Sequence, residues 1–184
     1  MRKSLPALLA LALASGLPAH HGHAQTAQGE AAAPAALLPA SLTRGAETNL
    51  PLPRFVSLKS DEGNARRGPS LTHRIDWVFR RRDMPLLVTA EFENWRRVED
   101  SDGQGGWIHY TLLSGVRTVV VESALAELTA RPDEAAEVNA RAEAGVIGRL
   151  GDCVPEWCRV SAGGEAGWVR KTDIWGVGAG ELRD

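Results

Sequence analysis

The chain has 184 residues, of which 43% are hydrophobic and 24% charged, and its formal net charge is −2. These values are typical of ordinary globular domains, and they exclude a large multidomain enzyme, a largely disordered chain and a membrane-embedded one. A mildly acidic chain also lacks the concentrated basic surface that nucleic-acid binding requires, so we expect no nucleic-acid partner.

The amino terminus has the three parts of a secretory signal peptide. Arg2 and Lys3 are basic, residues 5–17 are apolar, and Gly22-His23-Ala24 places small residues at the −3 and −1 positions of a cleavage site. The apolar stretch is shorter than the roughly 20 residues that span a membrane, and no later stretch approaches that length. The sequence therefore predicts a signal peptide over 1–24 and an exported mature chain, periplasmic or secreted, without a membrane span. An uncleaved anchor is the alternative.

Residues 25–53 are rich in Ala and Pro, carry few charges and show no sustained periodicity. Such a composition cannot bury a core and is typical of a disordered linker. A short amphipathic helix over 31–42 is the alternative. We expect folded structure to begin near Arg54.

The rest of the chain contains an internal repeat. The first copy has Trp95-Arg-Arg-Val98 followed by Gly106-Trp107-Ile108, and the second has Trp157-Cys-Arg-Val160 followed by Gly167-Trp168-Val169. The interval from Trp to Val is three residues in both copies. The sequence therefore predicts two tandem modules. We assign them to 54–121, with 11 basic and 9 acidic residues, and to 122–180 in a more acidic carboxyl-terminal half.

Both copies have the short apolar runs and glycine-bearing turns of β structure. The expected strands are 75–79, 86–90, 95–98 and 107–108 in the first copy, and 145–150, 157–160 and 168–169 in the second. About five short strands in each module favour an all-β chain of two small, partly open barrels. Residues 131–144 have helix propensity, so a helical turn there is the alternative.

The strings Asn64-Ala-Arg-Arg-Gly-Pro-Ser70, Ala90-Glu-Phe-Glu-Asn-Trp-Arg-Arg-Val98 and Gly106-Trp-Ile-His109 closely resemble the bacterial Src-homology-3-like domain family. In the second copy, Cys153 to Val160 and Asp173-Ile-Trp-Gly176 resemble the same family. The resemblance implies five-stranded β-barrels of exported or envelope proteins, many of which are associated with cell-wall peptides or with enzymes that act on them. Because fold does not determine function, it leaves the ligand open.

Cys153 and Cys158 flank the four residues Val154-Pro-Glu-Trp157 between two expected strands, which would place them opposite each other. In an exported protein this spacing predicts a disulfide. A zinc site would need further ligands, so we expect no metal and no cofactor. An ungapped superposition of the copies places Glu91 and Arg96 where the cysteines lie, so these two form a candidate ion pair.

The tryptophans are candidate ligand contacts. Trp95 and Val98 have opposite strand parity, as do Trp157 and Val160, so if the valines point inward the tryptophans point outward. We therefore take Trp95 and Trp157 as candidate ligand contacts, with Trp107, Trp168 and Tyr110 as further candidates. In the alternative, Trp107 and Trp168 cover the core. Trp175 has no counterpart in the first copy, and we expect it at the contact between the modules.

Arg80, Arg81 and Arg82 form the main basic cluster, which is either a solvated turn or a weak anion site. The motifs of serine hydrolases, zinc proteases and phosphate-binding loops are absent from the sequence, so we expect no catalytic residues. The sequence thus favours a non-catalytic binding or adaptor protein of the cell envelope, with a cell-wall peptide or an envelope protein as its partner. A structural partner without a wall ligand, or an accessory regulator of a wall hydrolase, is the alternative. The sequence gives no oligomeric state.

Overall fold

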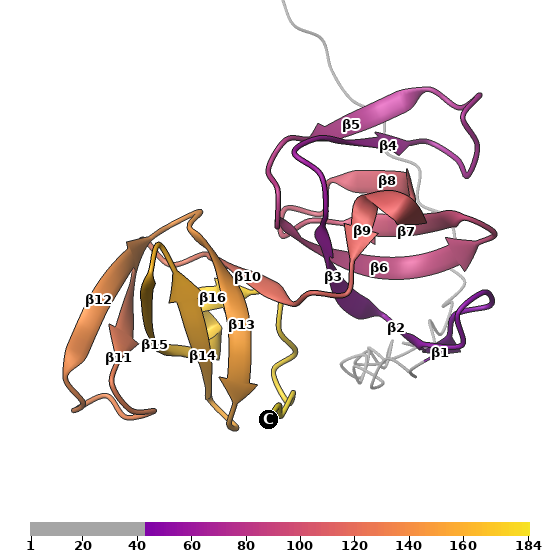
Figure 1. Ribbon diagram of the computed structural model, residues 1–184. Helices are drawn as coiled ribbons and strands as arrows, with labels where there is room; N and C mark the ends of the chain where they lie inside the picture. Colours follow the sequence, from indigo (N-terminus) through magenta and orange to yellow (C-terminus); the bar gives the residue numbers. More distant parts are fainter. Residues whose placement is uncertain (1–42) are drawn as a thin grey trace, which may run out of the picture. The chain divides into compact units, whose positions relative to one another are not determined.

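In a computed structural model of the protein, residues 43–184 are described, and they form β-strands and two short 3-10 turns with no α-helix (Figure 1). The predicted signal peptide and most of the predicted linker lie outside the described residues. Within residues 43–184, no helix is long and apolar enough to cross a membrane. The all-β prediction is confirmed.

The first module is a seven-stranded antiparallel sheet with the order β5-β4-β8-β7-β6-β3-β9. Its strands are β3 (Arg54–Leu58), β4 (Gly63–Arg66), β5 (Ile75–Phe79), β6 (Pro85–Phe92), β7 (Trp95–Glu99), β8 (Gly105–His109) and β9 (Leu113–Ser114), and the turn η1 (Tyr110–Leu112) joins the last two. Leu58, Phe79, Leu86 and Ile108 lie at the centre of its core, each no more than 2% exposed.

The second module repeats this arrangement strand for strand, with the order β12-β11-β15-β14-β13-β10-β16. Its strands are β10 (Thr118–Val121), β11 (Leu125–Thr129), β12 (Val138–Glu143), β13 (Ile147–Cys153), β14 (Trp157–Ala162), β15 (Glu165–Arg170) and β16 (Ile174–Trp175), with the turn η2 (Lys171–Asp173) before β16. Because the order of equivalent strands is the same, the duplication read from the tryptophan spacing is also a duplication of topology.

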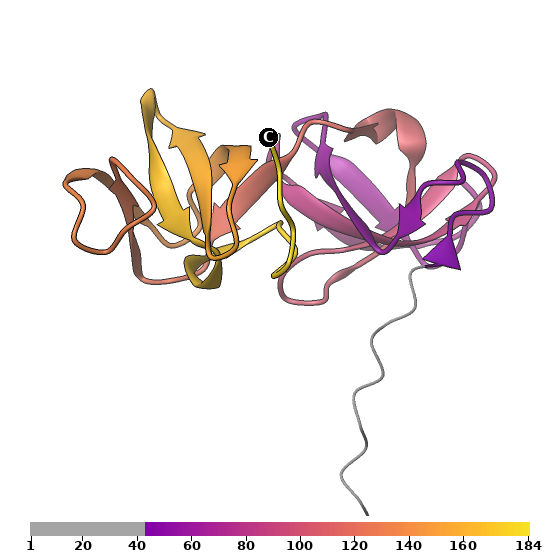
Figure 2. The ribbon, with the colours of Figure 1, turned by 90° about the horizontal axis from the view of Figure 1, so that it is seen from below.

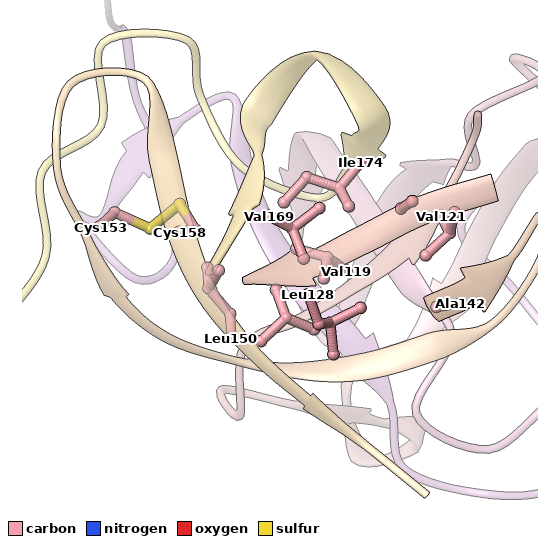
Figure 3. Close-up of a cluster of buried hydrophobic side chains, with 11 residues drawn as sticks. Val119, Val121, Leu128, Ala142, Leu150, Cys153, Cys158, Val169 and Ile174 are labelled. Carbon is pink, nitrogen blue, oxygen red and sulfur yellow. A yellow bond between two sulfur atoms is a disulfide. The ribbon is translucent and has the colours of Figure 1, made fainter. Parts of the chain in front are cut away.

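The core of the second module is aliphatic and includes the disulfide. Figure 3 shows Val119, Leu128, Leu150 and Val169 gathered in this core, with the bond between Cys153 and Cys158 at its edge. The two cysteines are direct partners in the register of β13 and β14, with Cα atoms 4.1 Å apart. The predicted disulfide is present.

Two sequence-based expectations differ from the structure, and the alternative of a helical turn over 131–144 is wrong. Each sheet has seven strands where about five were expected, and the additional strands include the two-residue β9 and β16. Thr118–Val121, which we had assigned to the first module, pairs with β13 and β16 of the second. Residues 138–143 form strand β12 and no helix, because Ala140 and Ala142 pack on the second core when β12 pairs with β11.

Folded structure also begins earlier than expected. Strands β1 (Thr43–Arg44) and β2 (Pro51–Leu52) form an antiparallel hairpin ahead of the first module, drawn in indigo in Figure 1. Leu52 is buried in the first core. The hairpin was not predicted from the Ala/Pro-rich sequence around it. The reason is that contacts with distant residues stabilise the hairpin, and its own sequence carries no local signal.

Candidate functional site

Glu91, near the end of β6, is the buried charged centre of the first module. Its side chain is 0% exposed. The backbone amides of Glu47 and Thr48 donate to Oε2 at 3.0 and 2.9 Å, and the Thr48 hydroxyl donates to Oε1 at 2.7 Å. Nη2 of Arg54 donates to Oε1 at 2.6 Å. One carboxylate thus fixes the hairpin β1–β2 to the sheet.

These donors set the protonation state of Glu91. Burial alone would raise its pKa, but the hydrogen bonds from Thr48, Arg54 and Glu47 outweigh it and lower the pKa from 4.5 to about 2. Glu91 is therefore ionised at neutral pH, and its charge faces two arginines.

The second of these arginines is Arg96 on β7. It is the register partner of Glu91, and its Nε lies 3.5 Å from Oε1. Its Nη1 also donates to the carbonyl oxygens of Glu93 and Trp95, both at 2.8 Å. The ion pair predicted from the superposition of the copies is thus confirmed, at the position where the second module has its disulfide.

A groove of about 360 Å³ is lined by both of the arginines that contact Glu91. Its lining combines two arginines, two aromatic rings and residues of the hairpin, among them Thr48, Arg54, Phe55, Arg96, Tyr110 and Ser114. Two guanidinium groups against the single carboxylate of Glu91 leave an excess of positive charge. Nη1 of Arg54 is buried and has no hydrogen-bond partner within residues 43–184.

Tyr110 stands at the mouth of the groove and is 48% exposed. Its ring packs on His109 at a centroid distance of 5.1 Å, and His109 in turn packs edge-on against Trp95 at 5.5 Å. The Arg96 guanidinium lies 5.9 Å from the Tyr110 ring, within the range of a cation–π contact. A buried tryptophan therefore supports the one tyrosine of the chain in an exposed position.

The two tryptophans expected to point outward are buried. Trp95 and Trp157 are each 8% exposed, yet they belong to neither core. The parity argument is consistent with this placement, but other side chains cover both rings: His109 lies against Trp95, and Arg170 lies 5.0 Å from the ring of Trp157. In the structure these rings support neighbouring side chains, and their ligand role stays a prediction.

The other tryptophans differ in exposure. Trp107 on β8 and Trp168 on β15 are half-buried. Trp175 packs edge-on against Phe55 at a centroid distance of 5.1 Å, and its expected place between the modules stays a prediction. Trp77 on the edge strand β5 is 40% exposed. Trp77 was not among the candidates named from the sequence.

The basic cluster is solvated and partly neutralised. Arg80, Arg81 and Arg82 are all exposed. Nε of Arg82 lies 2.9 Å from Asp61, and this pairing lowers the pKa of Asp61 through a hydrogen bond and charge attraction. No ion pair of Arg80 or Arg81 occurs within residues 43–184. An anion site at this cluster stays a prediction.

The groove itself was not predicted from the sequence. Tyr110 was a candidate and Glu91 was paired with Arg96, but nothing in the sequence places Thr48 or Arg54 near them. The contacts that Arg117 and Lys171 make with Glu181, a residue beyond β16, were also not predicted. Across the described part of the chain, no group of three or more His, Cys, Asp or Glu side chains could hold a metal ion.

Comparison with known families follows the same division into two copies. Residues 59–115 and 122–176 each match the family described as bacterial SH3 domain. No curated protein matches the chain.

Among solved structures, two chains from Trichomonas vaginalis, NlpC2 and NlpC1, are similar to this one at 14% sequence identity and a TM-score of 0.32. The NlpC2 match covers 67% of this chain and 48% of the other, and the NlpC1 match covers 75% and 50%. The chain thus spans about half the length of each.

Proposed function

Because this chain belongs to the bacterial SH3 domain family, a family of binding domains, we propose that it is an exported, non-catalytic binding protein of the cell envelope. Its first module recognises a cell-wall peptide, and the groove at Tyr110 is the binding site. The disulfide between Cys153 and Cys158 is compatible with an extracellular or envelope location, where such bonds persist.

The observation that carries this proposal is the pairing of an exposed aromatic ring with buried cationic side chains in one groove. Tyr110 offers a flat surface on which a peptide can pack. Arg54 and Arg96 supply more positive charge than Glu91 neutralises, which favours a ligand with a carboxylate group. Wall peptides are short chains that carry carboxylates, so they match both features.

One observation favours a second candidate function, namely docking onto an envelope protein, as a structural partner or as a regulator of a wall hydrolase. Strand β5 is an edge of the first sheet, and it exposes Ile75 and Trp77 by 44% and 40%. Exposed apolar side chains on a sheet edge are typical of protein contacts. This surface is distinct from the groove, so variants can separate the two functions.

Cosedimentation of the full chain with purified cell-wall sacculi tests the proposal. Wild type is expected to bind saturably, and Tyr110→Ala to weaken binding about tenfold, the usual loss for an aromatic contact worth about 1.4 kcal/mol. Phe92→Ala is the matched control, because Phe92 is 49% exposed and does not line the groove. No wild-type binding would contradict the proposal. Loss of binding on Trp77→Ala but not on Tyr110→Ala would move the site to β5.

A further inference from the structure

The C-terminal segment, residues 177–184, follows β16 and turns at residues 178–181, where the Glu181 amide donates to the Gly178 carbonyl at 3.0 Å, before it reaches the end of β13 (Figure 2). Arg183 forms an isolated antiparallel bridge with Cys153: the amide of Cys153 donates to the Arg183 carbonyl at 2.8 Å, and the amide of Arg183 donates back at 3.1 Å. The segment therefore adds to the end of β13 as a strand would.

Glu181 in this segment is held by Arg117. Nη1 and Nη2 of Arg117 donate to Oε1 and Oε2 of Glu181 at 2.8 and 3.1 Å, a two-pronged contact. The side chains of Arg117 and Glu181 are 16% and 24% exposed. Burial raises the pKa of Glu181, but the hydrogen bonds from Arg117 and from the Gly178 amide outweigh this effect and lower it.

Lys171 at the start of η2 holds the backbone of the same segment. Its Nζ donates to the carbonyl oxygens of Ala179 at 3.2 Å and Glu181 at 2.6 Å. A peptide segment with a turn at 178–181 is thus bound through one carboxylate, two carbonyl groups and one strand-like bridge. These are the contacts by which peptide-binding domains hold a ligand.

The residues that hold the C-terminal segment in the second module are equivalent to residues of the groove in the first module. Leu58 pairs with Leu113 in the first module, and Val121 pairs with Ile174 in the second. Counting four residues back from Leu58 and from Val121 makes Arg54 the counterpart of Arg117.

In the same way, Lys171 stands where the first module has Tyr110, and Cys153 stands where it has Glu91. Arg54 takes its carboxylate partner from Glu91 within its own sheet. The second module has a cysteine at that position, so the partner of Arg117 comes from the C-terminal segment.

We propose that Arg117 and Lys171 form a second peptide-binding groove, specific for a turn-forming peptide with a glutamate side chain, and that residues 178–183 of this chain occupy it. An acidic peptide of similar sequence competes for the groove when the segment leaves. The proposal does not depend on what the first groove binds.

The contacts that hold the segment are mostly polar and lie near the surface. Leu182, a large apolar residue of the segment, is 67% exposed. Segments with few buried apolar contacts open at low free-energy cost compared with the whole fold. A tethered segment nevertheless competes with a free peptide at an effective concentration in the millimolar range.

The test uses the full chain and a fluorescent peptide with the sequence of residues 177–184. Glu181→Lys places a positive charge against Arg117 and Lys171, and this repulsion should release residues 178–183 from the groove. Fluorescence anisotropy should then show peptide binding at least tenfold tighter than to wild type. The matched control is Glu165→Lys, at an exposed position at the start of β15, which should bind no better than wild type.

Two further binding measurements test whether the groove requires the glutamate side chain of the peptide and Arg117. The peptide with Gln in place of its Glu should bind Glu181→Lys weakly, and adding Arg117→Gln to Glu181→Lys should abolish binding. Equal binding to wild type and Glu181→Lys, or no binding to Glu181→Lys, would overturn the proposal.

Hydrogen exchange provides a measurement without added peptide. In Glu181→Lys, exchange of the Cys153 amide should be at least tenfold faster, because its acceptor Arg183 leaves, while the Val160 amide in β14 keeps its protection and reports that the sheet is folded. Unchanged exchange at Cys153 would show that the pair Arg117–Glu181 does not hold the segment, and it would likewise overturn the proposal.

Discussion

Glu91→Gln removes the charge of the buried carboxylate while keeping its shape. The substitution leaves Arg54 and Arg96, with side chains 18% and 9% exposed, facing a neutral amide. It also exchanges one acceptor oxygen for an NH₂ group. The Thr48 hydroxyl, which now donates to Oε1, and the amides that donate to Oε2 cannot all keep their acceptors.

The loss of stability expected for Glu91→Gln can be calculated in two ways. Lowering the pKa of Glu91 from 4.5 to about 2 corresponds to about 3 kcal/mol, at 1.36 kcal/mol per pKa unit. Removing one partner of a buried ion pair costs roughly 3–5 kcal/mol. We therefore expect Glu91→Gln to lower the free energy of unfolding by about 3 kcal/mol at neutral pH.

The lowered pKa of Glu91 also determines how its contribution to stability changes with pH. The pKa of Glu91 is lower in the folded protein than in the unfolded chain, so its stabilisation is complete above about pH 4.5 and is lost as the pH falls toward 2. A glutamine does not titrate. The difference in free energy of unfolding between wild type and Glu91→Gln should therefore narrow from about 3 kcal/mol at pH 6 to about 1 kcal/mol or less near pH 2.

Urea denaturation followed by tryptophan fluorescence and circular dichroism measures this difference at each pH. Glu127→Gln is the control, because Glu127 pairs with Arg141 at 2.9 Å on an exposed surface and should cost less than about 0.5 kcal/mol. A loss for Glu91→Gln no larger than that of the control, or a difference that stays constant down to pH 2, would refute the reasoning.

Two further predictions concern the second module. Cys153→Ser should lower the free energy of unfolding by on the order of 2 kcal/mol without abolishing folding, and reductant should lower the Tm of wild type; a Tm indifferent to reductant would count against the bond. Gly167→Ala should cost about 2 kcal/mol or more in urea denaturation, because a Cβ there would lie 2.6 Å from the Leu128 carbonyl carbon and push β11 from β15. Gly163→Ala, in an open turn with a φ of 60°, should cost about 1 kcal/mol, and an equal or larger loss than at Gly167 would contradict this account.

The parts of the fold that the sequence predicted depend on local or repeated signals. The matched intervals around Trp95 and Trp157 revealed two copies, and the copies have the same strand order. The spacing of Cys153 and Cys158 predicted a cross-strand pair, because a short turn between strands fixes the register of the residues that flank it.

The parts that were missed depend on contacts between distant residues. Strand parity indicated that Trp95 faces away from the core, but it cannot indicate that His109 covers it. The hairpin β1–β2 is held by Glu91, more than 40 residues away, so its own Ala/Pro-flanked sequence gave no sign of order. The same holds for Glu181 and Arg117, which are 64 residues apart.

The central claim, that the first groove is a binding site for wall peptide, is tested most directly by mapping the ligand onto the full chain. Soluble peptides released from sacculi would be titrated into ¹⁵N-labelled protein while amide shifts are recorded. The account predicts saturable shifts concentrated at Tyr110, Ser114, Thr48 and the neighbours of Arg96. Shifts concentrated at Ile75 and Trp77 of β5, or none at all, would contradict it.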